Sequence, residues 1–226
     1  KQKRFGSLVV QSLHQISFFA LPASVLLLIL RIPVVRLVFG ADNFPWKSTV
    51  LTGKVVAILA ISVAAQAMVQ LLIRAFYALK NTKVPFFITL TTVILYFVVS
   101  GIFVYFTDFG VLGLAWATTV SAYLELILFI FALHAETKCF TTKTFWWPQL
   151  KMLVSGFLMA VFLYLPFRIL DEVVFDTSRT LELIALTFST GTIGMLVYIY
   201  FSYFPNIDLN FLIQPHPLRA HNLDKP

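Results

Sequence analysis

Charged residues are scarce in this sequence. Asp, Glu, Lys and Arg make up 12% of its 226 residues, whereas 59% are hydrophobic. A soluble domain uses about 45–50% apolar residues, because polar side chains have to cover its surface. The composition therefore excludes a soluble globular protein and a disordered one. The single cysteine, Cys139, also excludes an internal disulfide framework.

The few charges are unbalanced in sign but do not form a patch. Lys and Arg number 17 against 10 acidic residues, which gives a net charge of +7. Proteins that bind nucleic acid concentrate such residues on one face, whereas here they are scattered between apolar runs. We therefore expect no nucleic-acid partner and interpret the charge as a signal of membrane topology.

The sequence also lacks the residue patterns of an enzyme. It contains neither the GxSxG nor the HExxH motif, and its glycine pair at 191 and 194 lies within an apolar run. The histidines stand at ends, in loops or in the tail, away from Cys139 and from carboxylate pairs at ligand spacing; they are His14, His134, His216 and His221. We predict no catalytic residue, no metal site and no cofactor.

What the sequence does contain is six long apolar runs. A helix needs about 20 residues to cross about 30 Å of hydrocarbon. The runs extend over Ile16 to Phe39, Val55 to Ala78, Val84 to Phe106, Val111 to Leu133, Met152 to Leu170 and Leu181 to Phe204. They do not alternate between polar and apolar residues as barrel strands do. The sequence therefore predicts an all-α, polytopic integral membrane protein with six transmembrane helices.

The distribution of Lys and Arg predicts the orientation. Six spans place both termini on one side, and that side would carry eleven Lys and Arg residues against six on the other. Because cytoplasmic loops are enriched in basic residues, we expect both termini in the cytoplasm. Residues 1–15 would form a cytoplasmic basic segment and residues 205–226 a cytoplasmic tail. The chain begins with Lys1, so we expect it to be the C-terminal portion of a longer protein.

Polar residues inside the second run lie four residues apart, at Ser62, Gln66, Gln70 and Arg74. Steps of four keep them on one face of a helix, over roughly 120° of its circumference. Unsatisfied polar groups are costly in hydrocarbon, so this face has to contact protein or water. Two interpretations remain: the stripe holds helices together, or it lines the path of a polar substrate.

Two further spans carry polar stripes. Thr89, Thr92, Tyr96 and Ser100 follow one another along the third, and Thr118, Ser121 and Glu125 share a face of the fourth. Glu125 is the only carboxylate well inside a span, so it is either functional or a structural tie. By depth, we expect it to pair with Gln70 or Arg74, or else to face a water-filled cavity.

Three segments resemble the MurJ/MviN family of lipid II flippases. They are Leu21-Pro22-Ala23 with the Ile32 to Gly40 stretch, the Arg74 to Pro85 stretch (RAFYALKNTKVP) and the Gly110 to Thr118 stretch (GVLGLAWAT). The resemblance covers roughly residues 20 to 125. It implies the last six helices of a fourteen-helix transporter of the polysaccharide-exporter superfamily.

The resemblance also implies a function. Such a protein would move lipid II, the undecaprenyl-diphosphate-linked peptidoglycan precursor, across the bacterial cytoplasmic (inner) membrane by alternating access. Its partners would be lipid II or a related polyprenyl-diphosphate-linked substrate, membrane lipids and the missing N-terminal half. The polar headgroup would pass through a central cavity, and the lipid tail would lie partly on a groove formed by the last two helices.

The resemblance divides the chain and selects its candidate residues. Residues 16–134 would form the four-helix part of the C-terminal lobe, and residues 135–204 two additional transmembrane helices. The cavity-side candidates are Gln70, Arg74, Thr118 and Glu125, joined by Gln66 from the same polar stripe. Alternatives are an exporter of another lipid-linked oligosaccharide, a drug or cation antiporter of the same superfamily, and a non-transporting scaffold for cell-wall enzymes.

Overall fold

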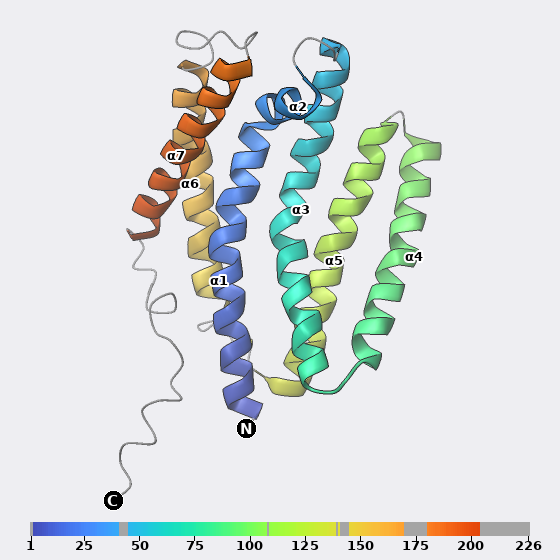
Figure 1. Cartoon of the computed structure of the whole chain (residues 1–226). Helices are drawn as coiled ribbons and strands as arrows, with labels where there is room; N and C mark the ends of the chain where they lie inside the picture. Colours follow the sequence, from blue (N-terminus) through green and yellow to red (C-terminus); the bar gives the residue numbers. More distant parts are fainter. Residues whose placement is uncertain are drawn as a thin grey trace, which may run out of the picture.

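The computed structural model describes residues 2–40, 45–107, 109–138, 140, 145–169 and 180–203, and the structural statements below concern these residues. Its elements are the helices α1 (Gln2–Ile29), α2 (Arg31–Phe39), α3 (Trp46–Ala78), α4 (Lys83–Phe106), α5 (Val111–Thr137), α6 (Trp147–Ile169) and α7 (Thr180–Tyr203) (Figure 1). Six of them are long and apolar enough to cross a membrane. The prediction of an all-α protein with six such helices is confirmed.

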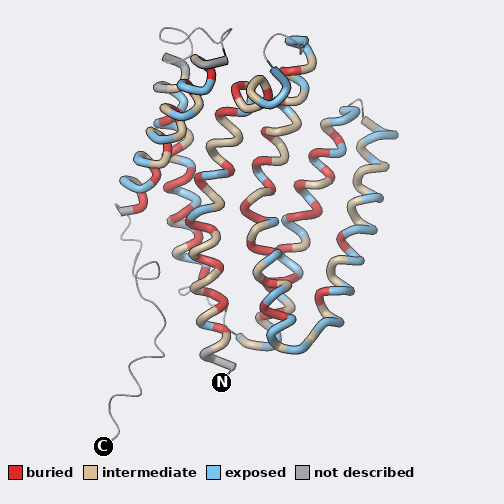
Figure 2. The backbone as a smooth tube through the Cα atoms, viewed as in Figure 1, coloured by how far each residue is buried: buried red, intermediate tan, exposed pale blue. Residues whose placement is uncertain are grey.

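The long helices run side by side, and the short α2 lies across one end of the bundle (Figure 1). Helix α3 packs between α1 and α5, while α4 packs mainly on α5 at one edge. The α6 and α7 pair packs on α1 at the other edge. As an edge helix, α4 buries little of its surface, and its buried residues are Pro85 and Thr92 (Figure 2).

The expected first span, Ile16 to Phe39, is wrong in its boundaries. Helix α1 already begins at Gln2, and the helix is interrupted at Leu30, between α1 and α2. Pro33 explains the break, because it has no N–H to donate to the carbonyl of Ile29 and its ring collides with that carbonyl in a continuous helix. Most of residues 1–15 are therefore helical, and their location in the cytoplasm stays a prediction.

The other five spans lie close to their expected positions, except at the start of α3. That helix begins at Trp46, nine residues before the expected Val55. Its 33 residues make it about 50 Å long, which exceeds the hydrocarbon thickness of about 30 Å. The polar residues near its start, including Lys47 and Lys54, therefore belong to a helical extension beyond the apolar run.

Two apolar cores meet at α1. The larger core joins α1, α3 and α5 around fully buried side chains that include Leu13, Leu72, Phe76, Phe129 and Leu133. The smaller core joins α1 to α6 and α7 through Phe18, Met152, Met159, Leu163 and Tyr198. Figure 2 shows the buried positions concentrated where neighbouring helices face each other. Helix α1 therefore holds the α6 and α7 pair to the rest of the bundle.

A buried polar contact reinforces this connection. The Gln149 side-chain amide on α6 donates to Ser17 Oγ on α1 at 2.6 Å and lies 3.3 Å from Met68 Sδ on α3. Ser17 Oγ also donates to that sulfur at 3.2 Å. All three side chains are buried, so the contact fixes the start of α6 against α1 and α3.

The turn between α3 and α4 is closed by its own backbone. Lys80 has φ +58°, and the N–H groups of Lys80 and Asn81 donate to the carbonyls of Tyr77 and Phe76. This is a Schellman motif, which satisfies the last carbonyls of a helix. The Asn81 amide donates to Glu136 at the end of α5 at 2.9 Å, so the turn also fixes α3 relative to α5.

Candidate functional site

A cavity of about 350 Å³ lies between α3, α4 and α5 at the middle of their length. Eight of its eleven lining residues are polar, which sets it apart from the apolar surface of the same helices. The polar residues are Gln66, Gln70, Thr89, Thr92, Tyr96, Thr118, Ser121 and Glu125, and the apolar ones are Val69, Val93 and Ala122.

The sequence forms this cavity by placing a polar stripe on each of three helices. The lining positions are 66, 69 and 70 on α3, then 89, 92, 93 and 96 on α4, then 118, 121, 122 and 125 on α5. Spacings of three and four keep each set on one helix face. Because α5 packs against both α3 and α4, the three faces meet.

The carboxylate of Glu125 is bound within the cavity. Thr89 Oγ1 on α4 donates to Glu125 Oε1 on α5 at 2.9 Å. The expected pairing of Glu125 with Gln70 or Arg74 is therefore wrong among the described residues, although Glu125 does line a cavity. Gln70 lines the same cavity, but it is Thr89 of α4 that lies within hydrogen-bond distance of the carboxylate, and Arg74 lies outside the cavity.

The α3 side of the cavity is formed by Gln66 and Gln70. The Gln66 amide donates to Ser62 Oγ at 2.8 Å, and the Ser62 hydroxyl donates to the Leu59 carbonyl at 2.7 Å. Ser62 is buried, whereas Gln66 and Gln70 are exposed toward the cavity. Arg74 is exposed one helical turn further along α3 and does not line the cavity.

The α5 side contributes two hydroxyl groups. Thr118 Oγ1 donates to the carbonyl of Leu114 in its own helix at 2.9 Å. Ser121 is 8% exposed, and its hydroxyl has no hydrogen-bond partner among the described residues. A buried hydroxyl without a partner is costly, so Ser121 is a polar group of the cavity wall that the described residues leave unsatisfied.

Four of the five candidate residues, Gln66, Gln70, Thr118 and Glu125, thus line one cavity, and Arg74 lies outside it. The candidate list omitted Thr89, Thr92, Tyr96 and Ser121, which also line the cavity. Their stripes were visible in the sequence. Thr89, about 9 Å along α4, and Glu125, about 13 Å before His134, also stand at similar depth, but depth alone does not show which neighbouring helix supplies the partner.

A second, wholly apolar groove of about 460 Å³ lies between α6 and α7. It is lined by Phe162, Leu196, Val197, Tyr200 and Phe201. The resemblance places a groove for a lipid tail on these two helices. Within the described ranges, no group of three His, Cys, Asp or Glu side chains lies close enough together to hold a metal ion.

Comparison with known proteins agrees with this architecture. The family described as "Lipid II flippase MurJ" matches residues 1–197. The chain belongs to this family. The chain is 27% identical over 201 residues to the "Lipid II flippase MurJ" of Thermosipho africanus and 25% identical over 202 residues to the "Probable lipid II flippase MurJ" of Bdellovibrio bacteriovorus.

A solved structure supports the fold. It is titled "Lipid II flippase MurJ, inward closed conformation" and superposes with a TM-score of 0.72 at 24% identity, over 95% of this chain and 41% of that one. Both relatives match 89% of this chain, yet the matches cover only 38% and 37% of their own lengths. The chain thus spans less than half the length of the proteins that it resembles.

Proposed function

We propose that this chain forms the C-terminal part of a flippase that translocates lipid II across the bacterial cytoplasmic membrane by alternating access, and that it is not an enzyme. The observation that carries the proposal is the polar cavity between α3, α4 and α5 in a member of the MurJ family. A polar cavity at membrane depth, surrounded by apolar helix surface, is the feature expected of a path for a polar headgroup.

The cavity offers neutral hydrogen-bonding groups rather than cations. The Gln66 and Gln70 amides can donate to or accept from the sugars and peptide of a headgroup, and Thr118 Oγ1, which donates to its own helix, can still accept. Arg74, one turn beyond Gln70, is the nearest cation along α3 and suits a phosphate oxygen. The apolar groove between α6 and α7 suits a polyprenyl tail.

We further propose that the open side of the cavity faces helices corresponding to the part of the relatives that this chain does not match. In this arrangement α1 to α5 belong to the C-terminal lobe, and α6 and α7 are the two additional helices. The separate core between α1, α6 and α7 supports this division.

The proposed orientation places the α3–α4 turn and both termini in the cytoplasm. It is tested by Thr82→Cys and Lys47→Cys, each in a background without other cysteines, and labelling of intact cells with an impermeant maleimide. Both positions are exposed and stand at opposite ends of the bundle. Labelling should occur at position 47 and be blocked at position 82, and the reverse pattern would invert the topology.

The function is tested by lipid II translocation in vesicles that contain the protein as the cell makes it. Two threonines offer a matched pair of substitutions. Thr118 and Thr91 both donate to the carbonyl four residues back, but Thr118 lines the cavity and Thr91 is exposed elsewhere on α4. Thr118→Val should slow translocation severalfold, and Gln66→Leu combined with Gln70→Leu should slow it further, whereas Thr91→Val should leave it unchanged.

Two results would contradict the proposal. If the unmodified protein gives no translocation above empty vesicles, the function is wrong. If the protein translocates lipid II but Thr118→Val and the double glutamine variant behave as Thr91→Val does, the cavity is not part of the path.

A further inference from the structure

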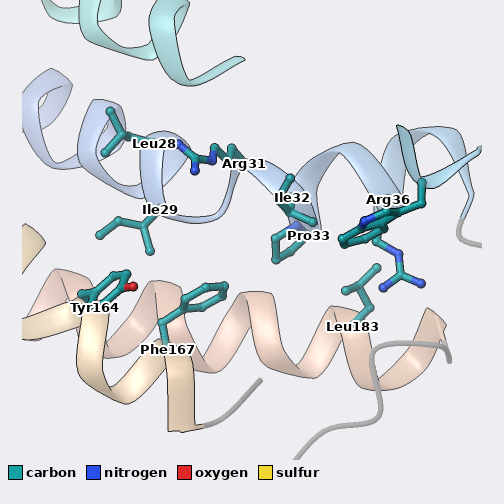
Figure 3. Close-up of a pocket in the computed structure, with 10 residues that line it drawn as sticks. Leu28, Ile29, Arg31, Ile32, Pro33, Arg36, Tyr164, Phe167 and Leu183 are labelled. Carbon is teal, nitrogen blue, oxygen red and sulfur yellow. The ribbon is translucent and has the colours of Figure 1, made fainter. Parts of the chain in front are cut away.

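A third cavity lies at the α2 end of the bundle. It shares no lining residue with the polar cavity between α3, α4 and α5. It has a volume of about 330 Å³ and is lined by the end of α1, the first two turns of α2, Trp46 of α3, and residues of α6 and α7. In Figure 3, Arg36 points toward Leu183 of α7, whereas the Arg31 guanidinium points back beside Leu28, and Tyr164 and Phe167 of α6 form the opposite wall. We name this cavity the α2 crevice.

The α2 crevice combines an apolar wall with two guanidinium groups. Leu28 and Ile29 belong to the last turn of the α1 span, and Arg31 follows immediately. The arginines therefore stand where the apolar part of α1 ends, which is the depth of the lipid headgroups. Trp46, which also lines the crevice, is a residue type enriched at that depth.

The charge of the α2 crevice is not neutralised by the described protein. Neither arginine makes an ion pair within the described ranges, and no described carboxylate lines the cavity. The Arg36 guanidinium lies 6.0 Å from the centre of the Trp46 ring, at the limit of a cation–π contact that restricts its position. Arg36 is half-buried and Arg31 exposed, so both can reach a ligand from the membrane interface.

We propose that the α2 crevice binds an anionic phospholipid. The phosphate would be held by Arg36, because a guanidinium group matches phosphate oxygens and remains charged, and Arg31 would add positive charge at the other end of the crevice. An acyl chain would lie along Leu28, Ile29 and Tyr164, toward the middle of the membrane. In the orientation proposed above, the lipid comes from the outer leaflet, but its chemistry does not depend on that orientation or on the transported substrate.

Such a lipid would have a structural effect. Helix α2 is nine residues long and touches α7, and the α2 crevice opens between them. A lipid bound there would connect α2 to the α6 and α7 pair through its phosphate and its chain. The site is separate from the polar cavity, whose walls are α3, α4 and α5.

The test is native mass spectrometry of the protein as the cell makes it, delipidated and titrated with phosphatidylglycerol. The test variant is Arg31→Gln with Arg36→Gln. The matched control is Lys47→Gln with Lys54→Gln, which removes two exposed cations near the start of α3 that do not line the crevice. The loss of a charge-assisted hydrogen bond lowers affinity roughly tenfold. The arginine variant should therefore bind phosphatidylglycerol roughly tenfold more weakly and the lysine control less than twofold.

Further arms separate the possible ligands. Phosphatidylcholine, which has no net charge, should bind weakly to all variants, and inorganic phosphate should not displace phosphatidylglycerol at millimolar concentration. The variant Arg31→Lys with Arg36→Lys keeps both charges and should show intermediate affinity. It replaces the glutamine variant in the test if that variant does not fold. Equal binding by the arginine variants and the lysine control would overturn the proposal, as would equal binding of phosphatidylcholine. Displacement by inorganic phosphate would overturn the lipid as occupant. Lipid II translocation is measured separately, so neither result decides the other.

Discussion

The bond from Thr89 to Glu125 predicts how strongly α4 is held to the bundle. Helix α4 is an edge helix that packs mainly on α5, and this bond is a side-chain hydrogen bond between the two helices at the cavity. Thr89→Val keeps the shape of the side chain and removes the donor. Glu125→Leu removes the acceptor. Each substitution should therefore weaken the attachment of α4, and the two effects should not add.

The magnitude follows from the geometry and the solvent. Hydrogen bonds between transmembrane helices average about 0.6 kcal/mol and reach about 1.7 kcal/mol in double-mutant cycles. The 2.9 Å distance and the carboxylate acceptor favour the upper part of this range, whereas the half-buried position of Glu125 in an open cavity favours the lower part. We expect a coupling free energy of about 1 kcal/mol.

The assay is reversible unfolding of the natural protein in mixed detergent micelles, for the two single variants and the double variant. Thr91→Val is the control, because Thr91 lies on the same helix but donates to the Phe87 carbonyl of α4 itself. Its coupling with Glu125→Leu should be near zero. A coupling between Thr89→Val and Glu125→Leu below about 0.3 kcal/mol, which is the usual error of additivity, would refute the tie.

Three further predictions concern stability and use the same unfolding assay. A Cβ at Gly113 would lie 2.7 Å from Phe103 Cβ, so Gly113→Ala should lower the free energy of unfolding by about 1–3 kcal/mol. Gly101→Ala is the control: no atom lies within 4 Å of the added Cβ, so the free energy of unfolding should rise by up to about 1 kcal/mol. Lys80→Gly should gain about 1 kcal/mol because Lys80 is left-handed, whereas Lys83→Gly in the first turn of α4 should gain nothing. Ser17→Ala should cost about 1–3 kcal/mol because it removes the buried partner of Gln149, whereas Ser189→Ala, whose hydroxyl bonds its own helix, should change stability by less than about 0.5 kcal/mol.

The number of membrane-spanning helices could be predicted from the sequence because hydropathy and length alone decide whether a segment can cross the membrane. The break at Leu30 is a different matter. The residues on both sides of Pro33 are apolar, so hydropathy alone gives one unbroken run. The proline itself, which lacks an N–H, is the sequence signal for the interruption. The early start of α1 was missed because basic and polar residues near the N-terminus were assigned to the solvent.

The site could be predicted as three separate stripes but not as one cavity. Spacing shows which residues of one helix share a face, and this placed Gln66 with Gln70 and Thr118 with Glu125. It does not show which neighbour that face meets. Glu125 faces both α3 and α4 at the cavity, and its partner is Thr89 instead of Gln70 or Arg74. Which side chain lies within bonding distance depends on contacts between helices that are distant in the sequence.

Under the proposed function, the position of Glu125 constrains where the diphosphate of the substrate could pass. Two like unit charges 4 Å apart repel each other by about 4 kcal/mol near a protein surface, and a diphosphate carries more than one charge. The carboxylate already accepts from Thr89, and no cation lines the cavity among the described residues. A diphosphate beside an ionised Glu125 would therefore be disfavoured, whereas sugar and peptide groups, which can donate to its oxygens, would not. The phosphates of a lipid-linked substrate are better accommodated toward Arg74, which lies one turn beyond Gln70 and outside the cavity, with the neutral amides of α3 separating the two charges.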